Sequence, residues 1–222
     1  DLLKYADLAM YSAKSSGRHM LVEFDHALNA ELDERMLLRR DLRHALADGQ
    51  MFVVFQPRVA GAHGQIASVE ALLRWRHPDK GFVSPEIFIA LAEESEFILE
   101  LGRWVLRQAL GQFQQWRSIP NHPVRHLSVN LSPLQLADPA LPAQLQALLE
   151  EFHIQPGELE LEITEGALIR DVDTAVERLA ALRALGVAIA LDDFGVGYSA
   201  MSYLSQLPFD TLKIDKSFVF AF

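Results

Sequence analysis

The chain has 222 residues, and its 30 acidic against 20 basic side chains give a formal net charge of −10. This acidic surplus opposes non-specific binding to nucleic acid polymers or anionic membranes, which depends on excess Lys and Arg. The absence of cysteine excludes disulfides, thiolate zinc sites and cysteine nucleophiles. No apolar run approaches the ~18 residues that a membrane-spanning helix needs.

The N-terminal part of the chain predicts a helix, a strand and a second helix. Apolar residues recur at helical spacing over 4–17, and 20–24 has the pattern of a short strand. A charged amphipathic helix is expected over 27–46, and Gly49 ends it. A helix this polar more often joins domains than fills a core, so we expect 26–50 to be a linker helix.

From Met51 onward the pattern indicates an α/β domain. Segments 51–59 and 66–75 are rich in β-formers, and helices are expected over 85–94 and 98–116. Short strands and helices then alternate, which implies parallel strands joined by right-handed crossovers. The strands are expected at 126–131, 158–163, 187–191 and 210–214, and the helices at 141–152, 171–185 and 200–206.

The strand count predicts an incomplete barrel. A TIM-like (β/α) barrel of eight strands takes about 250 residues. The segment 51–222 is shorter and shows about six candidate strands. We therefore expect a C-terminally truncated barrel with exposed apolar strand edges. Because the chain starts without Met and ends in an apolar segment, we expect it to be a piece of a longer protein.

Polar side chains stand inside or at the end of five predicted apolar strands. These residues are Glu70, Asn130, Glu162, the pair Asp192 and Asp193, and Lys213. The carboxyl ends of parallel barrel strands meet at one rim, where such barrels build their sites. Carboxylate and amide oxygens without cysteine suit Mg²⁺ or Mn²⁺, and two such ions would activate water and polarise a phosphodiester.

Each of these residues alone also has a structural explanation. Glu162 alone fits a surface or salt-bridged residue, Asn130 a turn, and Asp192 a cap. Lys213 is compatible with a Schiff base, but the neighbouring carboxylates would keep it charged. The glycine-rich segment 193–199 lacks the Gly-Lys-Ser/Thr ending of a phosphate-binding P-loop. The site interpretation therefore depends on the same arrangement recurring on successive strands.

Several ordered motifs resemble the EAL-domain phosphodiesterases of bacteria, which hydrolyse cyclic di-GMP. The resemblance begins at Glu70-Ala71-Leu72-Leu73-Arg74 and covers the whole of 51–222. The supporting blocks are Phe55-Gln56-Pro57, Ser128-Val129-Asn130-Leu131-Ser132, Glu160-Leu161-Glu162-Ile163-Thr164-Glu165, Asp192-Asp193-Phe194-Gly195 and Leu212-Lys213-Ile214-Asp215. It implies a modified barrel with one antiparallel strand.

The resemblance also implies a role for each matching residue. The implied metal ligands of a two-metal site with Mg²⁺ or Mn²⁺ are Glu70, Asn130, Glu162, Asp192 and Asp193. The implied catalytic residues are Lys213, Glu70 and Asp192, with Lys213 beside the catalytic water. The implied substrate contacts are Gln56, Leu72, Arg74 and Asp215. Glu165 resembles the glutamate that steadies the loop after Asp192 and links metal binding to dimerisation.

For the protein as a whole, the resemblance implies hydrolysis of cyclic di-GMP to linear pGpG by a cytoplasmic homodimer. The alternative is an inactive module that only binds cyclic di-GMP. Residues 1–25 resemble the C-terminal tail of a GGDEF diguanylate cyclase domain. Segments upstream would carry any membrane anchor. The family places a further catalytic Glu and a ligand-binding Gln beyond Lys213, so this piece alone is expected to be impaired.

Overall fold

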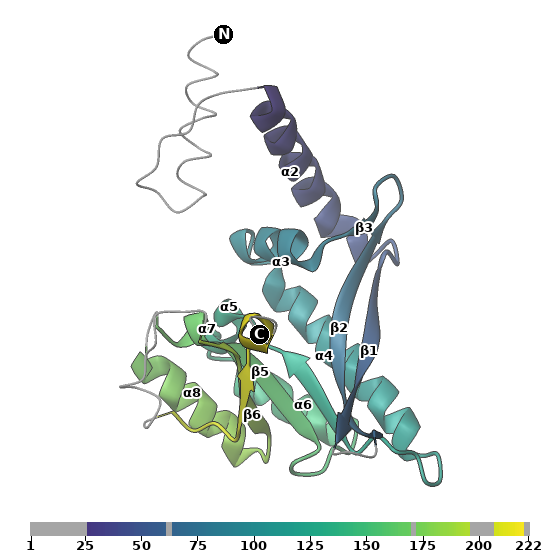
Figure 1. The fold of residues 1–222 in the computed structure, drawn as a ribbon, viewed down its shortest axis with the longest axis vertical. Coiled ribbons are helices and arrows are strands. Elements are labelled where there is room, and N and C mark those ends of the chain that lie inside the picture. Colours follow the sequence, from purple (N-terminus) through teal and green to yellow (C-terminus); the bar gives the residue numbers. More distant parts are fainter. Residues whose placement is uncertain (1–25, 61–63, 170–171, 196–206, 220–222) are drawn as a thin grey trace. The chain divides into compact units, whose positions relative to one another are not determined.

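The computed structural model describes residues 26–60, 64–169, 172–195 and 207–219 (Figure 1). The chain divides into two compact units, Asp1–Gln50 and Met51–Phe222. In the first unit, helix α2 (His26–Ala45) lies within one residue of the predicted helix. The expected elements at 4–17, 20–24 and 200–206, and the GGDEF-like segment 1–25, lie outside the described residues.

The second unit consists of strands joined by helices. Within the described residues the predicted elements occur in the predicted order, together with four short elements that were not predicted. Its described strands are β1 (Met51–Ala60), β2 (Gln65–His77), β3 (Gly81–Val83), β4 (His126–Asn130), β5 (Leu159–Thr164), β6 (Ala188–Phe194) and β7 (Thr211–Ile214). Its described helices are α3 (Pro85–Glu94), α4 (Ile98–Arg117), α5 (Pro133–Ala137), α6 (Leu141–Glu151), α7 (Glu165–Ile169), α8 (Val172–Ala184) and α10 (Lys216–Val219).

Within the described residues, the seven strands form one curled sheet in the order β1-β2-β4-β5-β6-β7, with β3 paired to β2. The pairs from β2 to β7 along this order are parallel, whereas β1 and β3 are antiparallel to β2. This confirms the predicted α/β barrel-like fold with its antiparallel strand. The three-residue β3 is an addition that the sequence pattern did not indicate, because so short a segment has no periodicity.

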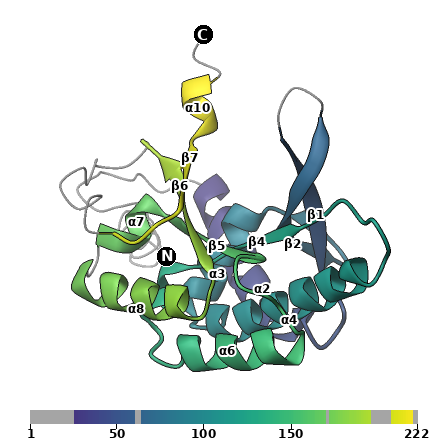
Figure 2. The same ribbon diagram turned by 90° about the horizontal axis from the view of Figure 1, so that it is seen from below.

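One face of the sheet carries the hydrophobic core. Helices α4, α6 and α8 lie along this face (Figure 2). Alternate strand residues such as Leu127, Leu161 and Ile189 point to the helices and are fully buried. Leu110 and Phe113 of α4 cover them because the apolar residues of α4 recur at helical spacing. Each such side chain contributes roughly 1.5–3 kcal/mol on burial.

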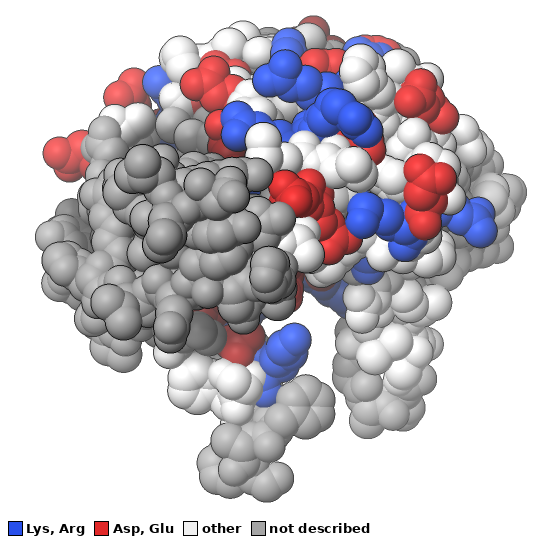
Figure 3. All heavy atoms as spheres, turned by 90° about the horizontal axis from the view of Figure 1, so that it is seen from above, with Lys and Arg blue, Asp and Glu red and all other residues white. Residues whose placement is uncertain are grey.

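The opposite face of the sheet is polar. Strand alternation directs Ser128, Glu160 and Glu162 away from the helices, although Ser128 and Glu162 are both buried. Figure 3 shows one face of the molecule, on which acidic and basic side chains are interspersed. No helix in the described parts of the chain is long and apolar enough to cross a membrane.

Candidate functional site

Five neighbouring strands bring polar side chains together on the concave face of the sheet. We call Glu70, Asn130, Glu162, Asp192 and Lys213 the site cluster. They come from β2, β4, β5, β6 and β7, in that order. The parallel register pairs Asn130 with Glu162 and Thr164 with Asp192, which sets the carboxyl ends of these strands side by side. Parallel pairing therefore produces the convergence that the sequence predicts.

Lys213 lies at the centre of the acidic side chains. Its Nζ donates to Glu162 Oε2 and to Asp192 Oδ2, the latter at 2.5 Å. Glu70 Oε2 lies 3.8 Å from the same nitrogen. Asn130 Nδ2 donates to Glu70 Oε1 at 2.9 Å, which leaves the amide oxygen of Asn130 available for a cation. The cluster is thus held together by a charged donor and an amide.

Burial and the hydrogen bonds between Lys213 and the carboxylates shift the pKa values of Glu162 and Lys213 in opposite directions. Burial raises the pKa of Glu162, and the hydrogen bond from Lys213 lowers it only in part. Burial also lowers the pKa of Lys213, but the hydrogen bonds to Asp192 and Glu162 outweigh it, so this pKa lies above its ordinary value. Lys213 is therefore a charged ammonium in this structure, which argues against a Schiff base.

The predicted ligand Asp193 lies at the exposed edge of the cluster. It belongs to β6 with a φ of 53°, an unusual conformation for a residue other than glycine, and its backbone N–H donates to Asp192 Oδ1 at 2.9 Å. Burial and the neighbouring Asp192 and Asp215 carboxylates raise the pKa of Asp193. The sequence places Asp192 and Asp193 after the strand, whereas β6 continues through both to Phe194.

Glu165 and Asp215 both lie near the C-terminal end of β6. Glu165 is buried at the start of α7, and its Oε2 accepts from Gly195 N at 3.4 Å. Asp215 follows β7, and its Oδ1 accepts from Ser217 N at 2.8 Å. Hydrogen bonds from the Ser217 side chain and then from the Ser217 backbone N–H lower the pKa of Asp215. The loop residues 196–206 lie outside the described part of the chain.

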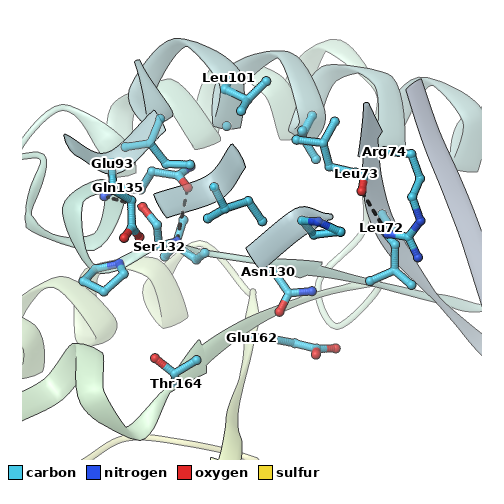
Figure 4. A pocket seen from close by; sticks show the side chains of 18 residues that line it. Leu72, Leu73, Arg74, Glu93, Leu101, Asn130, Ser132, Gln135, Glu162 and Thr164 are labelled. Carbon is cyan, nitrogen blue, oxygen red and sulfur yellow. Dashed lines mark hydrogen bonds between the residues drawn. The ribbon is translucent and has the colours of Figure 1, made fainter. Parts of the chain in front are cut away.

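A cavity of about 400 Å³ opens beside Glu162 and Asn130 (Figure 4). Its walls are mainly apolar residues of β2, α3, α4 and the segment that follows β4. Leu72 and Arg74 line it from β2, and Arg74 Nη1 donates to Leu73 O at 2.8 Å. Two predicted substrate contacts therefore share one cavity with two predicted metal ligands.

Gln56 lies on β1 and is exposed, next to the site cluster. The antiparallel register pairs it with Glu70 on β2. It does not line the cavity, whereas Leu72 and Arg74 do. Two of the predicted substrate contacts therefore lie at the two ends of the strand order: Gln56 on β1, and Asp215 directly after β7.

Basic side chains lie among the carboxylates. In the described residues, no group of three or more His, Asp or Glu side chains is arranged to hold a metal ion. Arg58 and Lys213 instead contact Glu70 and Glu162. The donor chemistry nevertheless fits a hard dication, because carboxylate and amide oxygens are the ligands that Mg²⁺ and Mn²⁺ prefer.

A second row of polar side chains, which was not predicted from the sequence, lies beneath the site cluster. We call Arg58, Ser128, Glu160 and Thr211 the lower polar layer. Ser128, Glu160 and Thr211 each precede a cluster residue by two positions and so point to the same face of their strand. Applying strand alternation one step further along β4, β5 and β7 would have identified these three residues.

Comparison with known proteins identifies many relatives. Residues 39–222 match the EAL domain family. An uncharacterized signaling protein of Caulobacter vibrioides is 46% identical over 98% of this chain and 26% of its own length. The bifunctional diguanylate cyclase/cyclic di-GMP phosphodiesterase MucR of Pseudomonas aeruginosa is 41% identical over 99% of this chain and 32% of its own length. The chain thus spans about a quarter to a third of these relatives.

The fold is also similar to solved structures. The PaMucR phosphodiesterase in complex with c-di-GMP matches with a TM-score of 0.77 and 40% sequence identity. The match covers 82% of this chain and 74% of that chain. The two proteins are therefore similar in sequence as well as in fold.

Proposed function

Because the chain belongs to the EAL-domain family, we propose that residues 51–222 form a metal-dependent phosphodiesterase domain that converts cyclic di-GMP to linear pGpG. The observation that carries the proposal is the meeting of Glu70, Asn130, Glu162, Asp192 and Lys213 beside an apolar cavity. The c-di-GMP complex of the 40% identical PaMucR phosphodiesterase supports the choice of substrate.

We assign metal binding to the oxygen-bearing residues of this site. The proposed ligands of two Mg²⁺ or Mn²⁺ ions are Glu70, Asn130, Glu162, Asp192 and Asp193. Asn130 fits this role because its amide nitrogen is already used on Glu70 and its oxygen is left for a cation. When bound, such ions supply Lewis-acid polarisation of the phosphodiester and lower the pKa of water.

Lys213 has a role of its own in the proposed reaction. Its ammonium donates to Glu162 and Asp192 and so is held where the acidic side chains converge. A fixed positive charge at this point stabilises the negative charge that develops on the attacking water and the phosphate oxygens. In this proposal Glu70 and Asp192 orient the reacting groups, because their carboxylates lie 3.8 Å and 2.5 Å from Lys213 Nζ.

The cavity beside the site cluster accounts for substrate binding in this proposal. Its mainly apolar walls suit a planar nucleobase, and Leu72 contributes to them. Arg74 lines the same cavity and would contact a phosphate through its guanidinium. We assign further substrate contacts to Gln56 and Asp215, at the two sides of the cluster.

The wider setting of the domain is part of the proposal. We assign residues 1–25 to the end of a GGDEF domain and 26–50 to a connecting helix, as MucR combines both activities in one protein. We also propose a cytoplasmic homodimer in which Glu165 couples the loop after β6 to the metal site. The hydrogen bond from Gly195 N to Glu165 supports that coupling.

The test uses the protein that contains residues 1–222, incubated with cyclic di-GMP and Mg²⁺ or Mn²⁺ and analysed by chromatography. We expect pGpG to form, and Glu70→Gln to abolish its formation. Calorimetry with Ca²⁺ in place of Mg²⁺ measures binding without turnover. Binding of cyclic di-GMP with no pGpG under any of the metals would favour the alternative, a module that only binds. Absence of both binding and pGpG would contradict the proposal.

A further inference from the structure

Arg58 on β1 connects the lower polar layer to the site cluster. Its Nη1 donates to Ser128 Oγ at 2.9 Å and to Glu160 Oε1 at 3.1 Å, both in the lower polar layer. Its Nη2 donates to Glu70 Oε2 at 2.8 Å and to Glu162 Oε1, both in the site cluster. One planar guanidinium thus contacts three carboxylates, of which the two in the site cluster, Glu70 and Glu162, come from different strands.

The lower polar layer fixes the orientation of this guanidinium. Ser128 is buried, and its hydroxyl donates to Glu160 Oε1 at 2.9 Å while it accepts from Arg58. Thr211 Oγ1 donates to Glu160 Oε2 at 2.8 Å from the far side. Both oxygens of Glu160 are therefore bonded, so the anchor of Arg58 is itself held by β4 and β7.

The backbone also directs Arg58 toward the site. Arg58 pairs with Ser68 of β2, and the register shifts directly after it, between Arg58 and Val59. Such an irregularity bends the strand and re-aims the adjoining side chain, and β-bulges are common next to active sites. The irregularity follows Arg58, so Arg58 still shares a face of β1 with Gln56, the partner of Glu70.

The contacts of Arg58 are compatible with cation binding by the same carboxylates. An ionised carboxylate offers about four lone-pair sites on two oxygens. Arg58 uses one oxygen of Glu70 and one of Glu162, and the other oxygen of each accepts from Asn130 or Lys213. With one bond on each oxygen, each carboxylate keeps about two of its lone-pair sites. Arg58 therefore does not have to leave when a dication enters.

From this geometry we propose that Arg58 is a positioning residue, which fixes Glu70 and Glu162 relative to each other for metal binding. The inference rests on the proposed function, because it gives Arg58 a task only if these two carboxylates are metal ligands. It predicts that the fork shape of the side chain is required, and not only its charge. A lysine carries the same charge but has no planar fork to join the two layers.

The experiment compares Mn²⁺ binding by isothermal titration calorimetry in four forms of the protein that contains residues 1–222. These are the wild type, Arg58→Met, Arg58→Lys and the matched control Arg107→Met. Arg107 pairs with Glu151 between α4 and α6, on the helical side of the sheet. We expect Arg58→Met to bind Mn²⁺ about 10- to 100-fold more weakly, as loss of supporting contacts to metal ligands generally does. We expect Arg107→Met to match the wild type.

The Arg58→Lys variant tests whether the forked shape of the guanidinium is required or only its positive charge. We expect Arg58→Lys to remain at least about 5-fold weaker than the wild type for Mn²⁺, because an ammonium is a point charge. At saturating Mn²⁺ we expect Arg58→Met to lower kcat about 10-fold or more while KM for cyclic di-GMP stays within about 2-fold. Full recovery by Arg58→Lys would overturn the inference, since charge alone would then suffice.

The remaining outcomes are also decisive. Unchanged or tighter Mn²⁺ binding by Arg58→Met, with normal binding by the wild type, would overturn the inference and leave the proposed function intact. No Mn²⁺ binding and no turnover by the wild type would overturn both.

If Arg58→Met does not fold, as judged by circular dichroism, Glu160→Gln replaces it. That variant keeps acceptor and donor groups near Ser128 and Thr211 but loses the anchoring charge. We expect about 3- to 10-fold weaker Mn²⁺ binding, and wild-type affinity would overturn the inference.

Discussion

Glu162 on β5 and Lys213 on β7 form an ion pair across the strand that separates them, β6. The Glu162 side chain is completely buried, and that of Lys213 is about a quarter exposed, at 24%. Asp192 on the intervening strand accepts from the same ammonium. Three adjacent strands therefore hold one positive charge between two carboxylates, so replacement of Lys213 affects the cluster as a unit.

Replacement of Lys213 by Met is expected to remove activity without removing metal binding. The change deletes the ammonium but keeps most of the side-chain length. We expect kcat for cyclic di-GMP hydrolysis to fall about 10²–10³-fold, the usual cost of losing one charge-stabilising donor. Initial rates measure this loss, and calorimetry with Mn²⁺ measures retained binding. Wild-type kcat in Lys213→Met would contradict the assigned role.

Glu162 gives a prediction about pH in metal-free buffer. Its pKa lies above the ordinary value of 4.5 because burial disfavours the charged form. A raised carboxyl pKa contributes stability that is complete below the ordinary pKa and is lost as pH rises through the folded-state pKa. We therefore expect Glu162→Gln, which resembles the protonated acid, to unfold at higher urea concentration than the wild type near pH 7. The difference should close toward pH 4.5.

The matched condition for this prediction is added Mn²⁺. The dication favours the ionised carboxylate, so it should stabilise the wild type at pH 7 more than it stabilises Glu162→Gln, which has lost one ligand. Urea unfolding at several pH values, with EDTA or with Mn²⁺, measures both effects. A wild type that is more stable than Glu162→Gln in EDTA at pH 7 would show that the ion pairs outweigh burial.

The larger elements could be predicted from sequence because their periodicity is strong. The bounds of α3 match the expected 85–94 in full, and the apolar face of α4 recurs over five turns. Glu70, Asn130 and Lys213 could be placed on one face because strand side chains alternate. The convergence of these residues then followed from parallel pairing of the strands.

The remaining features depend on tertiary structure. Helices α5 and α7 have five residues each, too few for an apolar period to appear. Arg58 contacts Glu162, which is 104 positions later in the sequence, and the antiparallel pairing of β1 with β2 places Arg58 in the sheet that holds Glu162. The approach of Gln135 to Gly102 likewise joins α5 to α4 in a way that no local pattern records.

Glu165 is expected to contribute to stability as well as to the metal site. It is buried, and Glu165→Ala removes the acceptor of Gly195 N. Gly195 is only half-buried, so the change removes an ordinary hydrogen bond and exposes the donor to water. We therefore expect a loss of about 0.5–1.5 kcal/mol in the free energy of unfolding. Glu165→Gln keeps an acceptor oxygen and should lose less. Urea denaturation measures both variants, and equal losses would show that the carboxylate charge is what stabilises the fold.

Gly195 and Gly166 form a matched pair for the last prediction. Gly195 has a φ of +99°, a conformation that other residues rarely adopt, and a Cβ there would lie 2.7 Å from ring carbons of Phe218 in α10. Gly166 lies in α7, and a Cβ there meets no atom within 4 Å. The same Gly→Ala change therefore meets strain and overlap at one position and open space at the other.

We expect Gly195→Ala to lower the free energy of unfolding by about 1–3 kcal/mol, because backbone strain and an overlapping contact both act against the folded state. Gly166→Ala should be neutral or raise it by up to ~1 kcal/mol, since alanine restricts the unfolded chain and favours the helix. Urea denaturation of the two variants measures the difference. Because Gly195 N also donates to Glu165, Gly195→Ala should lower activity in parallel, whereas Gly166→Ala should leave it unchanged. Equal stability of the two variants would mean that the contact between residue 195 and Phe218 relaxes without cost.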